Sequence, residues 1–171
     1  MPIDSRMIDN MKADRVRKVA DLANRRTRER FGRFLIEGPQ SVREAVTWMP
    51  DAVRDLYVQA ADGPDGPRIA GETLTSIVER SQEHRIYVHP ASEAVMCRIS
   101  PDCQGIAAVG DADAVRATAQ GTQLPEKPFV AAFWQVRDPG NAGTVIRAAD
   151  AAGCDAVVFV DDCVDMLNPK V

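Results

Sequence analysis

The sequence has little of what membrane, secreted and metal-binding proteins are built from. Its 171 residues include 5% aromatic side chains, two histidines and four cysteines. It has no run of about 18 consecutive apolar residues, the length that a membrane-spanning helix needs. The N-terminus carries Asp4 and Asp9, whereas a secretion signal needs a basic start followed by an apolar stretch. We therefore expect a cytoplasmic protein with no membrane partner.

The cysteines and histidines do not form a recognisable metal-binding pattern. No Cys-x-x-Cys pair is present, whereas structural zinc sites normally show closely spaced ligand pairs. The cysteines are Cys97, Cys103, Cys154 and Cys163. We expect them to be reduced and packed as small side chains, with no bound metal. His84 and His89 flank an apolar Ile-Tyr-Val run, and we expect both on the surface.

Charge is unevenly distributed along the chain. The net charge of −4 combines a charge of +5 in residues 1–33 with −9 in the remaining 138 residues. A basic segment on an acidic body suits a nucleic-acid partner, although a solvated helix end has the same composition. The arginines that crowd its end are Arg25, Arg26, Arg28, Arg30 and Arg33.

The pattern of apolar residues predicts alternating helices and strands in the first two thirds of the chain. A first helix is expected to start at Asp4 or Ser5 and to run through the basic segment to Gly32. The expected strands are 33–36, 53–58, 86–88 and 106–109. The expected helices between them are 39–46, 72–83 and 92–99. This order predicts an α/β fold with a parallel or mixed sheet covered on both faces.

The composition changes after residue 109. Residues 111–128 have the composition of an interdomain linker with some helical character. The apolar stretch 129–136 predicts a strand that a parallel sheet buries on both sides, and a helix over 142–152 and a strand over 156–160 would complete a βαβ unit. Because one such unit cannot bury both faces of its strands, we expect the chain to be a fragment of a longer protein.

The connection Asp138-Pro139-Gly140-Asn141-Ala142-Gly143 joins the strand to the helix of this unit. A helix N-terminus at a strand end offers free backbone N–H groups to anions, although neither a GxGxxG nor a GK[ST] motif is present. One interpretation is local: Asn141 caps the helix and Arg147 is a surface residue. The other is functional, because Arg147 presents a planar fork suited to phosphate on a helix of otherwise small apolar residues.

The stretch DPGNAGTVIRAADAAG, residues 138–153, resembles the first signature motif of the SpoU-type RNA ribose 2′-O-methyltransferases, the TrmH group of the SPOUT superfamily. The matching positions are Asp138, Pro139, Asn141, Gly143, Arg147, Ala149 and Gly153. The segment VDMLNPKV, residues 164–171, resembles the family's next segment along the chain. FLIEGPQSVREAV, residues 34–46, and CQGIAAV, residues 103–109, resemble the opening and the closing strand of the substrate-binding domain that often precedes the motif.

The resemblance implies a fold and a domain organisation. Residues 1–110 would form an RNA substrate-binding domain, an α/β/α sandwich similar to ribosomal-protein folds, with a basic N-terminal helix. Residues 111–128 would be a linker, and residues 129–171 the first βαβ unit of an incomplete SPOUT, or α/β knot, methyltransferase domain.

The resemblance also implies a reaction and its residues. A methyl group would pass from S-adenosylmethionine to a ribose 2′-hydroxyl of rRNA or tRNA, and the complete enzyme would be a homodimer. Asn141 and Arg147 would be catalytic. Because a guanidinium stays protonated, we expect Arg147 to hold a phosphate and the ribose rather than to act as the base. The expected RNA-binding residues are Arg25, Arg26, Arg28, Arg30, Arg33 and Glu37.

The cofactor pocket and the knot of this family lie downstream of anything present here. We therefore expect this chain alone to bind no S-adenosylmethionine and to methylate nothing. Two other functions stay open: a non-catalytic RNA-binding module of ribosomal-protein type, and a small-molecule α/β enzyme that uses the loop at Asp138 for an anion.

Overall fold

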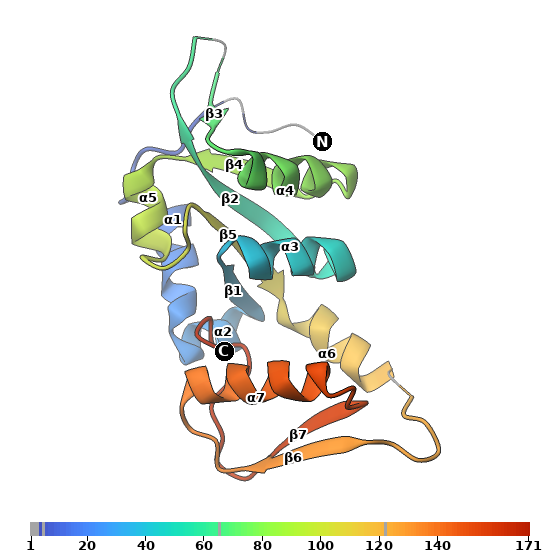
Figure 1. The fold of residues 1–171 in the computed structure, drawn as a ribbon. Coiled ribbons are helices and arrows are strands. Elements are labelled where there is room, and N and C mark those ends of the chain that lie inside the picture. The colour runs from blue at the N-terminus through green and yellow to red at the C-terminus, as the bar shows by residue number, and fades with distance from the viewer. Residues whose placement is uncertain (1–3, 5, 65, 122) are drawn as a thin grey trace. The chain divides into compact units, whose positions relative to one another are not determined.

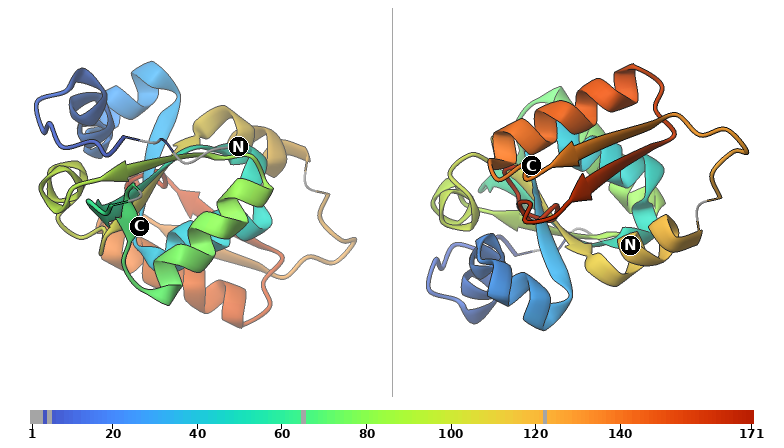
Figure 2. Two further views of the ribbon diagram at one scale, coloured as in Figure 1. Left: turned by 90° about the horizontal axis from the view of Figure 1, so that it is seen from above. Right: turned by 90° about the horizontal axis from the view of Figure 1, so that it is seen from below.

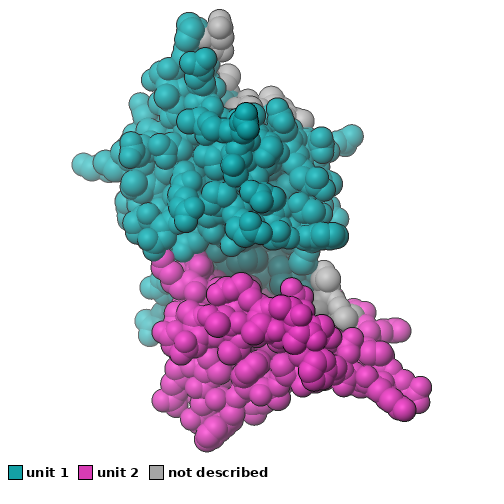
Figure 3. Space-filling view, viewed as in Figure 1, with its two compact units in different colours: residues 1–115 teal, residues 116–171 magenta. Residues whose placement is uncertain are grey.

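The computed structural model describes residues 4, 6–64, 66–121 and 123–171 of the chain, which divides into two compact units (Figure 1). Residues 1–115 form the first unit and residues 116–171 the second, as coloured in Figure 3. The boundary falls inside helix α6 (Ala112–Gly121). The segment expected to be a linker therefore begins as a regular helix.

The first unit is built on a mixed sheet. Its strands are β1 (Arg33–Glu37), β2 (Val53–Ala61), β3 (Arg68–Ile69), β4 (Tyr87–Ala91) and β5 (Ile106–Asp111). Strand β5 pairs antiparallel with both β1 and β2, and β4 pairs parallel with β2. The short strand β3 pairs antiparallel with the end of β2. The predicted mixed sheet is confirmed.

Helices cover both faces of this sheet (Figure 2). One layer holds α1 (Asp14–Ala20), α2 (Arg25–Phe31) and α5 (Glu93–Ile99), and the other holds α3 (Pro39–Trp48) and α4 (Glu72–Glu83). Successive residues of a strand point to opposite faces, so Tyr57 packs with the α1 layer while Leu56 and Val58 pack with α3 and α4. The α/β/α sandwich is therefore confirmed.

The prediction for the first helix is wrong at its start and in its middle, whereas Gly32 ends the helical segment as predicted, as the C-cap of α2. Asp4 and Ile8 lie beside β4 instead: the Ile8 N–H donates to the Pro90 carbonyl at 2.8 Å, and the Ser92 N–H donates to the Ile8 carbonyl at 2.9 Å. These ladder bonds satisfy backbone groups that a helix would otherwise have to pair. Asn24 then interrupts the helix between α1 and α2, because its side chain caps the N-terminus of α2 by accepting from the Arg26 N–H at 2.9 Å. Ser5 lies outside the described residues.

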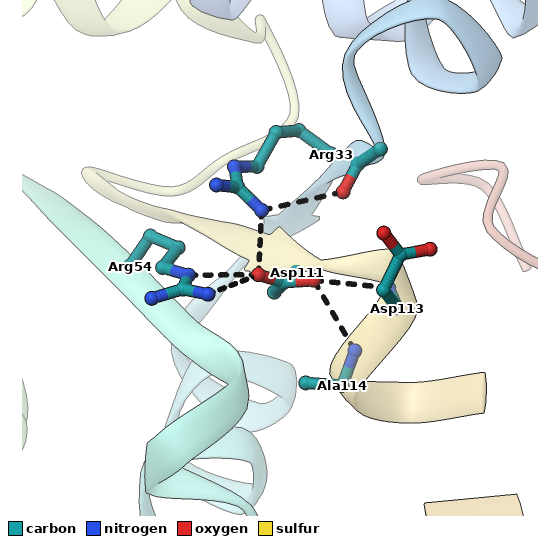
Figure 4. A network of polar contacts seen from close by, with 6 residues as sticks. Arg33, Arg54, Asp111, Asp113 and Ala114 are labelled. Atoms are coloured by element: carbon teal, nitrogen blue, oxygen red, sulfur yellow. Dashed lines mark hydrogen bonds and ion pairs between the residues drawn. The ribbon is translucent and has the colours of Figure 1, made fainter. Parts of the chain in front are cut away.

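Asp111 ties three parts of the first unit together (Figure 4). Its Oδ2 accepts from Arg33 Nη1 at 2.6 Å, across β1, and from Arg54 Nε at 2.8 Å, across β2. Its Oδ1 accepts from the N–H groups of Asp113 and Ala114, which is the geometry of a helix N-cap for α6. The Arg54 hydrogen bonds hold the pKa of the Asp111 carboxyl well below its usual range, against the opposing effect of burial.

We expect Asp111→Asn to lower the free energy of unfolding by about 2 kcal/mol at neutral pH, because charge-assisted bonds to two half-exposed arginines are weakened. A carboxyl whose pKa is lower in the folded state stabilises the fold above its unfolded-state pKa, about 3.9. That contribution is lost as the pH falls toward the folded-state pKa. Urea unfolding should therefore show a gap between wild type and variant that is constant above about pH 5 and shrinks below about pH 4. A gap independent of pH would contradict this assignment.

The second unit is a parallel βαβ unit, as predicted. Strands β6 (Val130–Trp134) and β7 (Ala156–Val160) pair in parallel, joined by α7 (Pro139–Ala151). The expectation that the first strand is buried on both sides is wrong: Trp134 is 69% exposed, Val130 37% and the preceding Phe129 57%. In a two-stranded sheet covered by one helix, alternate side chains have nothing to pack against. Phe133 and Phe159, by contrast, lie with ring centroids 5.9 Å apart.

No helix in the described part of the chain combines the length and the apolar character needed to cross a membrane.

Candidate functional site

Helix α7 begins at the connection that the sequence singles out. Asp138 is its N-cap, because its Oδ1 accepts from the Asn141 N–H at 2.7 Å. Pro139 occupies the first turn, where its missing N–H costs nothing. The interpretation of Asn141 as the cap is therefore wrong. Asn141 gives its backbone N–H to the cap, and its side chain is exposed in the first turn.

Arg147 is exposed one turn beyond Gly143. Its Nη2 lies 3.5 Å from Thr144 Oγ1, and a β-carbon added to Gly143 would lie 2.9 Å from Arg147 Nη1. The side chain therefore lies back along the helix toward the N-terminus, the usual direction in an α-helix. The same β-carbon would lie only 2.0 Å from the Val171 carbonyl oxygen, so the close approach of Val171 requires glycine here.

The start of α7 thus combines an exposed amide, an exposed guanidinium and a helix N-terminus. The contacts described for the Arg147 side chain are with Thr144 and Gly143 rather than with Asn141. A helix N-terminus favours anions, and a guanidinium next to it adds a planar donor set for phosphate. This arrangement can hold a phosphate-bearing ligand with a polar side chain beside it.

The basic segment divides into exposed and buried arginines. Arg26 and Arg30 are exposed on α2, and Arg25 donates to Glu29 Oε1 at 2.8 Å on the surface of the same helix. Arg30 Cζ lies 5.2 Å from the ring centroid of Phe31, which is itself 50% exposed. These side chains give α2 a basic surface that carries an aromatic ring.

Arg28 is a correction to the expected RNA-binding set. It is 4% exposed, and its Nη1 donates to the carbonyls of Leu22 and Ala23 at 2.8 Å each. Arg33 is bound to Asp111, and Glu37 accepts a hydrogen bond from the Ser100 hydroxyl. Arg28 and Glu37 are thus engaged within the first unit, whereas Arg33 binds Asp111 and is still part-exposed. The candidates for contact with RNA are therefore Arg25, Arg26, Arg30 and Arg33.

A cavity on the α1 side of the sheet is lined by residues that, apart from Arg33, the sequence did not single out. The cavity has a volume of about 530 Å³. Its polar and aromatic lining consists of Arg15, Lys18, Phe31, Arg33, Asp55 and Tyr57. Burial, and secondarily the charge of Asp55, raises the pKa of Tyr57 well above its usual range, so its hydroxyl stays protonated.

His89 lies behind this lining. It is 1% exposed, so the expectation that it is a surface residue is wrong, whereas His84 is exposed as expected. Its Nδ1 lies 3.1 Å from Arg15 Nη1 and its Nε2 lies 3.0 Å from Asp55 Oδ1. The period of two along β4 turns His89 toward the α1 layer, and this period is the signal in the sequence that could have placed it there.

Two protein families match this chain, each over one part of it. The family described as the MRM3-like substrate binding domain matches residues 13–108, and the SpoU rRNA Methylase family matches residues 128–171. The first match covers more than half of the chain.

Individual relatives agree with the two families. The chain is 31% identical over 170 residues to the Bacillus subtilis 23S rRNA (guanosine(2553)-2′-O)-methyltransferase RlmP, which covers 96% of this chain and 58% of that protein. It is also 43% identical over 60 residues to human mitochondrial rRNA methyltransferase 3, and this match covers 34% of this chain and 14% of that protein. The chain thus spans little more than half the length of the Bacillus subtilis relative.

Solved structures show the same fold. The AdoMet-bound rRNA methyltransferase from Sinorhizobium meliloti superposes with a TM-score of 0.71 at 20% identity, over 96% of this chain and 58% of that one. The SpoU methyltransferase AviRb from Streptomyces viridochromogenes, in complex with AdoMet, superposes with a TM-score of 0.67 at 23% identity, over 93% of this chain and 57% of that one. This chain therefore belongs to the family of the MRM3-like substrate binding domain, which forms its N-terminal part, and its residues 128–171 match the SpoU rRNA Methylase family.

Proposed function

We propose that this chain contains the RNA-binding domain and the first part of the catalytic domain of an rRNA or tRNA ribose 2′-O-methyltransferase. The observation that carries the proposal is the start of α7. There Asn141 is exposed in the first turn, and Arg147 is exposed further along the helix with its guanidinium reaching back to Thr144, within the segment that matches the SpoU rRNA Methylase family.

S-adenosylmethionine would supply an electrophilic methyl group for the ribose 2′-hydroxyl. Two AdoMet-bound structures among the similar proteins support this choice. We assign none of the residues of this chain to holding the cofactor. The 2′-O position is supported by the name of the Bacillus subtilis relative.

Arg147 would bind a phosphate next to the target ribose and so fix the 2′-hydroxyl in line for attack. Its guanidinium stays protonated and cannot accept the proton that the hydroxyl loses. A phosphate oxygen held by Arg147 is the better proton acceptor. Asn141, closer to the helix N-terminus, would orient the sugar through its amide.

The exposed side of α2 would bind the RNA backbone. Arg26 and Arg30 project from this helix, and Arg25 is exposed beside them. Lysine and arginine that neutralise phosphates release counterions, so binding weakens steeply as salt rises. The RNA partner is supported by the rRNA methyltransferases to which the chain is similar.

A non-catalytic RNA-binding module is the second candidate. The first unit has its own two-sided core and carries the basic surface of α2, so it could bind RNA without catalysing any reaction.

For the complete enzyme, of which this chain would be a part, the proposal includes a homodimeric assembly and a cytoplasmic location.

The salt dependence of RNA binding tests this proposal on the chain itself. We expect Arg26→Ala/Arg30→Ala to reduce the slope of log K against log[salt] by about 2, close to one unit for each phosphate contact. Arg43→Ala/Arg80→Ala is the matched control, because these two arginines are exposed on α3 and α4 in the opposite layer. Fluorescence anisotropy with a labelled rRNA fragment gives both slopes. Equal slopes for the two double variants would remove α2 from the RNA-binding surface.

A further inference from the structure

The cavity beside α1 and α2 has a lining that the proposed function does not yet use. Its volume of about 530 Å³ is in the range of small-ligand sites. Three cationic side chains line it together with one carboxylate and two rings. A nucleotide offers the complementary groups: an anionic phosphate, a flat base with two π faces, and an edge of donors and acceptors.

At this cavity His89 contacts both Arg15, a hydrogen-bond donor, and Asp55, a hydrogen-bond acceptor. Arg15 Nη1 lies 3.1 Å from His89 Nδ1 and 3.4 Å from His89 Nε2, so the guanidinium faces the imidazole ring. On the other side, His89 Nε2 lies 3.0 Å from Asp55 Oδ1. Rings packed on the imidazole, with centroids at 4.9 Å for Tyr57 and 4.6 Å for Tyr87, fix its orientation. Arg15 and Asp55 are therefore placed before any ligand arrives.

A guanidinium beside a carboxylate fits guanine better than the other bases. Guanine carries the O6 acceptor next to two donors, N1–H and N2–H₂, so Arg15 can donate to O6 while the two oxygens of Asp55 accept from N1 and N2. Adenine, cytosine and uracil each present only one donor group on the corresponding edge, so Asp55 could accept from one group of these bases and not from two. Asp55 has the capacity, because its side chain is 39% exposed and each carboxylate oxygen has two lone pairs.

The remaining lining suits the rest of a nucleotide. Phe31 is 50% exposed and offers a surface on which a base can stack. Lys18 and Phe31 also line a neighbouring cavity of about 300 Å³, together with Arg26 and Arg30. Cationic side chains therefore line a continuous path for a strand of RNA from the basic surface of α2 to the first cavity.

We propose that this cavity binds an unpaired guanosine of the RNA substrate, with Arg15 and Asp55 reading the base and Phe31 stacking on it. The proposal rests on the RNA-binding function proposed above and adds to it a base preference in the substrate-binding domain. Lys18 and Arg33 contact the phosphates that flank the guanosine.

Binding of short labelled RNAs to the chain tests this site. The probes are single-stranded pentanucleotides with a central G, A, C or U between uridines, measured by fluorescence anisotropy at low salt. We expect wild type to bind the G probe about tenfold more tightly than the A probe, the value of one charge-assisted hydrogen bond. Asp55→Asn keeps a partner for His89 but replaces one acceptor by a donor, so we expect the preference for G to fall below about threefold.

Phe31→Ala should weaken all four probes by about tenfold, because a stacking platform is lost whichever base is bound. Trp48→Ala is the matched control: Trp48 is an aromatic residue that is 76% exposed on α3, in the other layer. Its removal should leave all four affinities unchanged. Circular dichroism melting of each variant shows whether the fold is kept, and Phe31→Leu replaces Phe31→Ala if the latter does not fold.

The outcomes separate this site from the proposed function. Salt-dependent binding of all four probes with no preference for G, unaffected by Asp55→Asn, would overturn the guanosine site and leave RNA binding intact. Absence of binding to any probe and to the rRNA fragment would overturn both. Binding of free GMP as tightly as the G probe would overturn the assignment to RNA and identify a mononucleotide ligand instead.

Discussion

Replacing Arg28 with methionine is expected to lower the free energy of unfolding of the first unit by about 3 kcal/mol. The Arg28 side chain is buried, and its Nη1 satisfies the carbonyls of Leu22 and Ala23 at 2.8 Å each. Methionine keeps most of the side-chain volume, so the loss comes from the buried Leu22 carbonyl, at about 1–3 kcal/mol, and from the part-buried Ala23 carbonyl, which both lose this donor. In equilibrium terms this is a change of more than a hundredfold.

Arg30→Met is the control, because Arg30 is exposed two residues further along the same helix. Surface substitutions of this kind change stability by about 0.5 kcal/mol or less. Urea unfolding followed by circular dichroism gives both values, and amide exchange in β5 assigns the transition to the first unit. Equal stabilities for the two variants would show that Arg28 is not part of the core.

The contrast between these arginines shows what the sequence of the basic segment could not predict. Five arginines within nine residues read as one patch. Their division depends on Asn24, which ends the first helical stretch and restarts the chain as α2 with a different face toward the sheet. The free energies of the two alternatives, a new helix capped by Asn24 and one helix that continues through it, are similar. Tertiary packing decides between them. Once that break is placed, Arg28 is buried and Arg26 and Arg30 are exposed.

Elements with strong periodicity were predicted well. Helix α4 (Glu72–Glu83) and strand β7 (Ala156–Val160) have the predicted bounds. The failures involve pairing between distant segments: Asp4 and Ile8 lie against β4, and the two-residue strand β3 pairs with the end of β2. Neither has a period of its own that could be recognised locally.

The same distinction applies to the candidate sites. Asn141 and Arg147 were found because one helix and the turn before it contain the whole motif. Arg15, Asp55 and His89 come from three segments that only the sheet brings together, and none of them belongs to a local motif. Contacts of this kind depend on strand order and register, which spacing along the chain does not encode.

Replacing Arg147 with alanine is expected to reduce methyl transfer to RNA by at least about a hundredfold. Holding a ribose and its phosphate in line contributes several kcal/mol to such a reaction, and a displacement of about 1 Å removes about two orders of magnitude. Arg147 is exposed and touches only Thr144 and Gly143 among the contacts described for its side chain. The fold should therefore keep its stability, so that the loss belongs to the reaction.

The measurement is transfer of a radioactive methyl group from S-adenosylmethionine to rRNA by the protein as its own cell makes it. Arg137→Ala is the matched control: Arg137 is 66% exposed in the same unit and its ion pair with Asp162, at 3.4 Å, is a surface contact. Arg147→Lys keeps the charge but loses the planar fork, and we expect an intermediate loss of about tenfold in kcat. Full activity of Arg147→Ala would contradict a catalytic role for this residue. A wild-type protein that transfers no methyl group would leave the RNA-binding module as the function of the fold, because that function depends on α2 and the sheet and needs nothing from α7.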